Sequence, residues 1–296
     1  NIGDLMSLII PANSLSGGGF AVDNSCRFDG TSSYLSKTPG STSNRQKWTY
    51  STWVKKSNIN GLNQKIFEGG VDGNTLTDVL FKTDESFRFY SEDAGITKIN
   101  FVTNAVYRDP SAWYHIVVAV DTTQGTDTNR VKLYVNGVQE TSFATATYPA
   151  VNYNTFVNYS SAANVIGRRS YYGDFDFGGY LSETVLIDGT QLDPTSFGEF
   201  DEDSGIWKPI SVSGLTFGTN GFYLDFKDSA NLGNDASGGT DFTESGITAI
   251  DQTTDTPTNN FATWNPLVKT SSTVTISEGN TIGTEATNGS YFGIVT

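Results

Sequence analysis

Residues Trp113–Phe143 read WYHIVVAVDTTQGTDTNRVKLYVNGVQETSF, and this stretch predicts three β-strands joined by two turns. Its first part, Trp113–Val120, carries Ile, Val and aromatic residues on both faces of the pleat. This distribution is typical of a central strand that is covered on two sides. Residues Arg130–Val135 instead alternate between apolar and polar side chains, which indicates a strand with one buried and one wetter face.

The dipeptide Asn136-Gly137 predicts a tight hairpin after the alternating strand. Both central residues of a type I′ turn adopt positive φ, which Asn and Gly do at low cost. We therefore expect the strand that begins at Val138 to return beside the preceding one. The residues expected in or beside the core are Trp53, Trp113, Ile116, Val118, Leu133 and Val135.

The composition favours β-structure and argues against nucleic-acid binding. Of 296 residues, 31 are Gly, 14 Tyr and 19 Phe, while only 17% are charged. This aromatic, turn-rich balance is typical of all-β proteins. The formal net charge is −14. Affinity for a phosphate backbone depends on Lys and Arg displacing counterions, so we expect no nucleic-acid partner.

The cysteine content and the apolar runs predict a protein with no internal disulfide and no membrane insertion. Cys26 is the only cysteine, and it is expected to pack as a small apolar residue. No apolar run approaches the roughly 20 residues of a membrane span. Leu5–Pro11 is apolar but short, and it lacks the basic flank of a signal peptide. We therefore expect synthesis in the cytoplasm of the producing cell.

Further motifs follow one another along the first two thirds of the chain. They are CRFDGTSSYL at Cys26–Leu35, WTYSTWVK at Trp48–Lys55, Val165–Gly167, Phe177–Tyr180 and Glu183–Ile187. Together with the Trp113 strand and LYVNGV, they resemble the laminin-G-like, concanavalin-A-like lectin family of jelly-roll domains. The resemblance implies an all-β fold, an antiparallel two-sheet β-sandwich. Sugar binders, glucanases, pentraxins and adhesion modules share this fold, so it does not decide the function.

Changes in composition along the chain predict four parts. We expect residues 1–19 to form an N-terminal arm and residues 20–200 to form the sandwich. Residues 201–267 are expected to be a C-terminal β-rich, loop-rich extension, and residues 268–296 the start of a further β-segment. The Tyr, Asn and Ala-rich segment Thr145–Asn164 is expected to wrap a sheet edge.

A narrower resemblance concerns three segments. Met6–Gly30, Arg108–Trp113 and Thr256–Leu267 are similar to virion structural proteins, either fibre or decoration proteins, of tailed marine bacteriophages. This resemblance implies a place on the virion surface, other virion proteins as partners and a homo-oligomer. A trimer is favoured by analogy with phage fibres.

The sequence predicts no catalytic residues. Glu199, Asp201 and Asp203 would share one face of a strand, as the carboxylates of retaining glycosidases do. However, they follow a turn and precede Ser204-Gly205, whereas the glucanase motif lies within an apolar strand. His115 is the sole histidine and lies in the central strand, so we expect it to be packed or hydrogen-bonded there.

The loop YYGDFD offers aromatic and acidic side chains together. A sugar site needs aromatic faces for stacking and polar groups for the hydroxyls. Tyr171, Tyr172, Asp174 and Asp176 are therefore the candidate ligand-binding residues.

Calcium is the one cofactor that the sequence suggests, although none is expected to be required. Oxygen-rich loops suit this hard cation, and laminin-G-like relatives often carry it. Candidate ligands are Asp225, Asp228, Asn231 and Asp235, which do not follow the EF-hand spacing. An Asp, Asn and Gly-rich segment is also the composition of an ordinary loop.

The sequence is compatible with three function classes. They are a virion structural protein, a free carbohydrate-binding or adhesion module, and a glycoside hydrolase. The phage-like segments and the missing catalytic set favour the first. We therefore expect a non-enzymatic bacteriophage virion protein with a lectin-like domain that attaches the particle to host-cell surface glycans.

Overall fold

The computed structural model describes residues 19–59, 61–262, 274–277 and 280–285. The described residues form two large antiparallel sheets and two small ones, and their only helical segments are single 3₁₀ turns. These turns are η1 (Asp127–Asn129), η2 (Pro194–Ser196) and η3 (Ala249–Asp251). The all-β fold class is thereby confirmed. Within the described part of the chain, no helix has the length and apolarity that crossing a bilayer requires.

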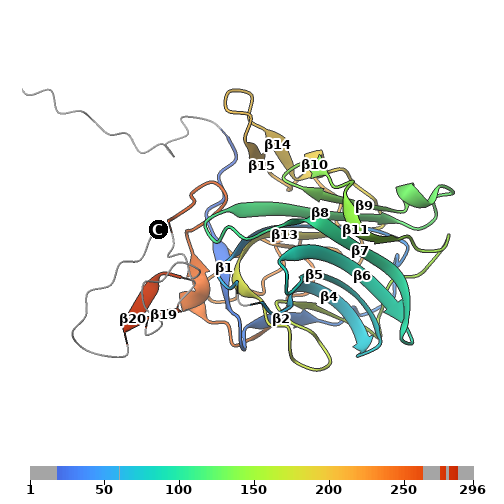
Figure 1. Cartoon of the computed structure of the whole chain (residues 1–296), viewed down its shortest axis with the longest axis horizontal. Helices are drawn as coiled ribbons and strands as arrows, with labels where there is room; N and C mark the ends of the chain where they lie inside the picture. The colour runs from blue at the N-terminus through green and yellow to red at the C-terminus, as the bar shows by residue number, and fades with distance from the viewer. Residues whose placement is uncertain (1–18, 60, 263–273, 278–279, 286–296) are drawn as a thin grey trace, which may run out of the picture.

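The first large sheet, which we call sheet A, is built around the predicted central strand (Figure 1). Its order is β10 (Val138–Gln139), β9 (Val131–Val135), β8 (Trp113–Asp121), β3 (Lys47–Lys56), β13 (Gly178–Asp188), β1 (Ser25–Asp29) and β18 (Gln252–Thr253), with β16 (Phe222–Leu224) paired to β13. In β8 every side chain except that of Tyr114 is buried, as expected for a strand covered on both faces.

The second large sheet, sheet B, packs face to face against sheet A (Figure 1). Its order is β11 (Phe143–Thr147), β7 (Ile96–Val106), β6 (Ser86–Asp93), β5 (Thr75–Phe81), β4 (Gln64–Asp72), β12 (Ala163–Ile166), β2 (Tyr34–Lys37) and β17 (Thr243–Ser245). The two small sheets are hairpins. They pair β14 (Gly198–Phe200) with β15 (Trp207–Pro209) and β19 (Val274–Ser277) with β20 (Ile282–Glu285).

The core lies between the two sheets and is rich in aromatic side chains. Tyr50 of sheet A stacks on Phe67 of sheet B, with ring centroids 4.5 Å apart. Of the predicted core residues, four lie in this core: Ile116, Val118, Leu133 and Val135. Trp53 and Trp113 are also buried, but they belong to a separate cluster with Tyr180 and Trp207 on the outer face of sheet A.

The predicted hairpin turn is present. Asn136 and Gly137 have φ values of 48° and 77°, and β10 returns beside β9. The turn is covered by Trp207 from the β14–β15 hairpin, so closely that a Cβ at Gly137 would overlap the indole ring. Gly is therefore required here both by the backbone conformation and by this close approach.

Residues after position 200 contribute to both large sheets. β16 and β18 extend sheet A, and β17 extends sheet B. Phe222 and Leu224 of β16 reach the main core. The described part of the predicted extension is therefore packed together with the sandwich.

The segment Thr145–Asn164 does more than wrap an edge. It begins within β11, which is the edge strand of sheet B, but it ends in β12, which lies between β4 and β2 in the interior of that sheet. The edge prediction is correct only for its start, because Ala163 and Asn164 at its end belong to an interior strand. Within the predicted arm 1–19, only Gly19 is among the described residues.

Candidate functional site

Side chains on the outer face of sheet B form a polar and aromatic row. Phe87 and Phe89 of β6 point into the core, so the intervening Arg88 and the following Tyr90 point outward. The strand register places Asn100 of β7 and Asp78 of β5 on either side of Tyr90. Glu68 of β4 is paired with Asp78 and continues the row.

A chain of charges runs along this row beneath the surface. Lys65 Nζ lies 2.8 Å from Asp78 Oδ2, and it also contacts the Glu68 carboxylate. Arg88 Nη2 lies 3.2 Å from Asp78, and its guanidinium lies 4.4 Å from the centroid of the Tyr90 ring. Buried charges are tolerated when they are paired and hydrogen-bonded in this way. The pairing holds Arg88 and Tyr90 in fixed positions on the face.

A β-bulge explains why Lys65 and Glu68 meet. Residues three apart on a regular strand point to opposite faces. The register between β4 and β5 shifts between Lys65 and Phe67, so Ile66 is an extra residue on β4. The bulge brings the Lys65 ammonium and the Glu68 carboxylate to the same outer face.

The predicted ligand-binding residues lie on the loop of residues 167–177, which joins β12 to β13 and which we call the tyrosine loop. The loop is closed at its base by a 2.8 Å hydrogen bond from Phe177 N to Gly167 O. A second bond of 2.8 Å, from Arg169 N to Asp174 O, closes it nearer the tip. The loop is therefore an ordered structure.

The tyrosine loop is also fastened to the outer face of sheet B. Lys65 N donates to Phe175 O at 2.9 Å, and Ser170 N donates to Glu68 Oε1 at 3.0 Å. Further along, Arg169 Nη2 donates to the carbonyl of Gly73 in the β4–β5 turn at 3.0 Å. The loop thus lies beside the row of Glu68, Asp78, Tyr90 and Asn100, as one wall of that face.

Tyr171 and Tyr172 are presented to solvent by this ordered loop. Their side chains are 62% and 59% exposed, and their rings meet edge to face with centroids 5.0 Å apart. The guanidinium of Arg169 lies 4.3 Å from the centroid of the Tyr172 ring. Exposed aromatic rings that are already held in place lose little conformational freedom when they bind a ligand.

Asp174 and Asp176 face arginines of the same loop. Asp174 lies 3.9 Å from Arg169, and Asp176 lies 3.3 Å from Arg168. Burial raises the pKa of Asp176, and the nearby Arg168 opposes that shift. Of the four predicted ligand-binding residues, the two tyrosines are therefore exposed, whereas the two aspartates mainly brace the loop.

Several polar atoms of this region are buried without a hydrogen-bond partner among the described residues. They are Arg88 Nε, Asn100 Oδ1, Arg169 Nε and Asp174 Oδ1. Buried polar groups are nearly always paired with protein, water or ligand. The atoms belong to side chains of the sheet B face and of its wall, and each of them is buried.

The candidate calcium ligands are already engaged within the chain. Asp235 is 4% exposed, lies 3.1 Å from Lys37 Nζ and accepts a 3.0 Å bond from Tyr223 N. Asp225, Asp228 and Asn231 take part in local turns or side-chain hydrogen bonds. Among the residues that the structure describes, no three acidic, His or Cys side chains are placed to hold a metal ion. Calcium binding by these residues therefore stays a prediction.

The carboxylates considered for catalysis do not lie together on one strand. Strand β14 ends at Phe200, and Asp201 begins a turn in which its carboxylate accepts bonds from the Asp203 and Ser204 amides. Glu199 and Asp201 lie 3.3 and 3.0 Å from Lys208 Nζ. These positions assign Glu199 and Asp201 to ion pairs within the β14–β15 hairpin.

His115 is a packed histidine, as predicted. Its Nδ1 accepts a 3.0 Å hydrogen bond from Trp207 Nε1, and its Nε2 lies 2.8 Å from Ser51 Oγ. The ring stacks on Trp53, with centroids 4.8 Å apart. Burial lowers the pKa of His115 to about 3, so the neutral imidazole is the form present at neutral pH.

Sequence reasoning identified the tyrosine loop but missed the sheet face beside it. The missed residues are Lys65, Glu68, Asp78, Arg88, Tyr90 and Asn100. A signal for two of them was present, because Phe87-Arg88-Phe89-Tyr90 alternates and places Arg88 and Tyr90 together on the non-core face. Their neighbours across the sheet depend on register, which this pattern does not specify.

Comparison with known families matches residues 29–191, more than half of the chain, to the family described as the concanavalin A-like lectin/glucanases superfamily. A comparison with curated proteins finds no match.

Solved structures include several with a similar fold. A Bacteroides ovatus protein, provisionally described as carbohydrate binding, has a TM-score of 0.53 at 16% identity. The alignment covers 80% of this chain but only 62% of that protein. A domain of a Geobacillus stearothermophilus arabinanase, solved with arabinotriose, has a TM-score of 0.43 at 20% identity, covering 58% of this chain and 73% of that one. The SAP-like pentraxin of Limulus polyphemus has a TM-score of 0.42 at 18% identity, and the alignment covers 58% of this chain and 78% of that one. Likeness at these identities concerns the fold alone.

Proposed function

The chain belongs to the concanavalin A-like lectin/glucanases superfamily, and from this premise we propose that it is a non-enzymatic carbohydrate-binding module. Its binding surface is the outer face of sheet B, with the tyrosine loop as one wall. The glycan lies along Tyr90 and Asn100 and contacts Tyr172 at the wall.

The observation that carries this proposal is the mixture of side chains on one face. The apolar C–H faces of a sugar ring pack on aromatic rings, while its hydroxyls need donors and acceptors in fixed positions. Tyr90 and Tyr172 offer the aromatic surface. The half-buried, outward-facing side chains of Arg88 and Asn100 add a guanidinium donor and an amide that can donate and accept.

The positions of the carboxylates support binding without hydrolysis. A glycosidase needs two carboxyl groups that flank the scissile bond, one as acid and the other as base or nucleophile. Glu68 and Asp78 are instead tied to the same Lys65 ammonium, and they are 0% and 1% exposed. We therefore expect no release of reducing sugar from β-glucans or bacterial polysaccharides. Release that is abolished by Glu199→Gln would contradict this part of the proposal.

The binding test uses paired variants. In affinity electrophoresis on a panel of immobilised polysaccharides, Tyr172→Ala and Tyr90→Ala should each weaken binding about tenfold or more, since loss of an aromatic contact costs on the order of 1.4 kcal/mol. Phe200→Ala is the matched control, because Phe200 is 51% exposed but lies on the β14–β15 hairpin. Equal retardation of all four proteins would refute the assignment of the site.

We propose further that this carbohydrate-binding module is part of a bacteriophage virion. It is supported by the resemblance of Met6–Gly30 and Thr256–Leu267 to phage structural proteins, although residues 1–18 and 263–267 lie outside the described residues. Several copies on one particle would convert a weak sugar site into firm attachment through effective concentration. Light scattering should then show a homo-oligomer, with a trimer favoured, and antibodies should label the outside of virions. If the protein is a monomer and is absent from purified particles, the virion role is refuted and the proposed function is that of a free carbohydrate-binding module.

A further inference from the structure

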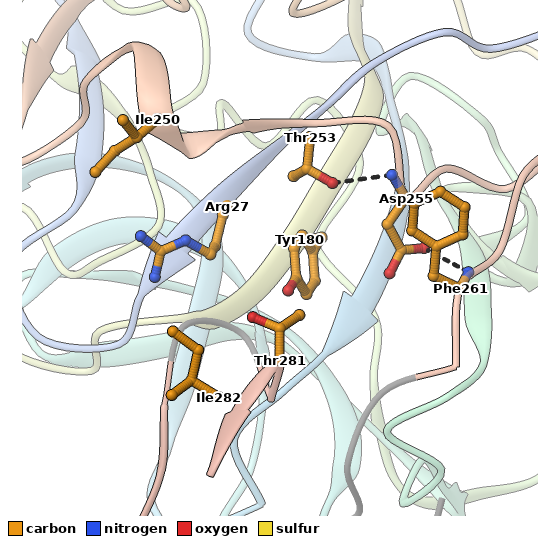
Figure 2. Close-up of a pocket in the computed structure, with 8 residues that line it drawn as sticks. All are labelled: Arg27, Tyr180, Ile250, Thr253, Asp255, Phe261, Thr281 and Ile282. Atoms are coloured by element: carbon orange, nitrogen blue, oxygen red, sulfur yellow. Dashed lines mark hydrogen bonds between the residues drawn. The ribbon is translucent and has the colours of Figure 1, made fainter. Parts of the chain in front are cut away.

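A second candidate site lies on the opposite sheet. A pocket of about 300 Å³ opens on the outer face of sheet A, against the β19–β20 hairpin (Figure 2). This volume is at the lower end of the range for ligand pockets, which is roughly 300–1,000 Å³. We call it the sheet A pocket. Figure 2 shows the Tyr180 ring at its centre, with the Arg27 guanidinium on one side and the Asp255 carboxylate on the other.

Both charged groups of the pocket are neutralised by partners within the chain. Arg27 Nη2 lies 2.7 Å from Asp251 Oδ1. Asp255 Oδ2 lies 2.8 Å from the buried Lys55 ammonium. A charged ligand would enter beside completed ion pairs and lose its hydration without gaining a counter-charge, which is unfavourable. The electrostatics therefore favour a neutral ligand.

The pocket floor is polar and rigid. Asp255 Oδ1 also accepts a 3.0 Å bond from Trp113 Nε1, and Asp255 N donates to Thr253 Oγ1 at 2.9 Å. Lys55 further donates to Asn260 Oδ1 and Phe261 O, both at 2.8 Å. These bonds fasten the segment that carries Phe261 to sheet A. They leave the floor lined by hydroxyl and carboxylate oxygens whose positions are set before a ligand binds.

The rim, in contrast, is apolar. Ile250, Phe261 and Ile282 line the pocket, and their side chains are 81%, 46% and 48% exposed. They come from three separate segments of the chain, so three exposed apolar side chains gather at one opening. A ligand with a hydroxylated edge and an apolar ring face would match the polar floor and this rim together.

We propose that the sheet A pocket binds a single neutral sugar unit, which enters with its hydroxyls toward Thr253 and packs its ring face on Phe261. The choice of a sugar rests on the proposed function, whereas the neutral charge and small size follow from the pocket. This site differs from the sheet B face, which is open and suited to an extended chain. The module would then contact glycans through both of its sheets.

The test measures binding of methyl α-glucoside, methyl β-galactoside and N-acetylglucosamine to the full chain by saturation-transfer NMR. At least one of the three should bind saturably. Phe261→Ala and Ile282→Ala should each weaken that binding about tenfold or more. Tyr90→Ala with Tyr172→Ala, which changes the sheet B face, should leave it unchanged. Methyl glucuronide should bind more weakly than the neutral sugar that binds.

The outcomes separate the two sites. Binding of none of the three sugars, or binding that both pocket variants leave unchanged, overturns the sheet A pocket, whatever happens on polysaccharides. Equal affinity for methyl glucuronide and that neutral sugar also overturns it, because the charge argument then fails. The pocket is supported if only the pocket variants weaken binding of the small sugar. The sheet B site is refuted if Tyr90→Ala and Tyr172→Ala leave polysaccharide binding intact.

Discussion

Replacing Gly137 by Ala should destabilise the protein through two separable causes. The first is the backbone, because φ is 77° at this position and an L-residue in the left-handed region costs about 1–2 kcal/mol. The second is Trp207, whose indole occupies the place where the new Cβ would lie. Moving the indole breaks its 3.0 Å bond to His115 and leaves a buried acceptor unpaired, which costs about 1–3 kcal/mol. The expected loss is therefore about 2–5 kcal/mol in total.

Gly95 offers a matched control. It follows Ala94 in the β6–β7 turn, and the two have φ values of 78° and 50°, close to those of Gly137 and Asn136. No heavy atom lies within 4 Å of a Cβ built at Gly95, so Gly95→Ala carries the backbone cost alone. We expect that variant to lose about 1–2 kcal/mol. The difference between the two variants measures the contact with Trp207.

The measurement is equilibrium unfolding in urea of the wild type and both variants, followed by circular dichroism and tryptophan fluorescence. Free energies of unfolding come from the transition midpoints when the slopes agree. Gly137→Ala should unfold at a clearly lower urea concentration than Gly95→Ala. If the two variants lose the same free energy to within about 0.5 kcal/mol, Trp207 does not cover the turn and the reasoning is refuted.

Three further outcomes are expected. Because burial lowers the pKa of His115 from 6.5 to about 3, this group stabilises the fold above pH 6.5 and loses that contribution as the pH falls through 3. His115→Gln should remove this contribution, so the urea midpoint should fall less between pH 6.5 and pH 3 in the variant than in the wild type. Burial raises the pKa of Glu183 from 4.5 to about 7, although the hydrogen bond from Tyr223 acts in the opposite direction. The contribution of Glu183 to the stability of the fold is therefore full below pH 4.5 and is lost as the pH rises through 7. Glu183→Gln should remove that loss, and an unchanged pH profile would contradict the shift. If calcium binds at Asp225–Asp235, adding it after chelator treatment should raise the melting temperature, and Asp228→Ala should abolish the increase; no shift would exclude calcium there.

Local patterns predicted the sandwich well where one short segment determines its own structure. The run of apolar residues in Trp113–Val120 marks a strand covered on both faces, and Asn136-Gly137 specifies its turn by backbone conformation alone. The pairing of the later strands carries no such signal. β16, β17 and β18 have only two or three residues each, and their partners β13, β2 and β1 are distant in sequence. β16 packs Phe222 and Leu224 into the core, a long-range contact that a local pattern does not reveal.

The candidate site shows why a loop is easier to predict than a sheet face. Tyr171 and Tyr172 are adjacent in sequence and lie close to two aspartates, so the sequence itself shows that aromatic and acidic side chains share this loop. Lys65 and Glu68 share a face only because Ile66 is bulged, and a regular strand would have separated them. Without the bulge the Lys65 ammonium would point into the core, away from Asp78. The charge chain that positions Arg88 and Tyr90 thus depends on one extra residue in β4, a feature of register that strand propensity does not encode.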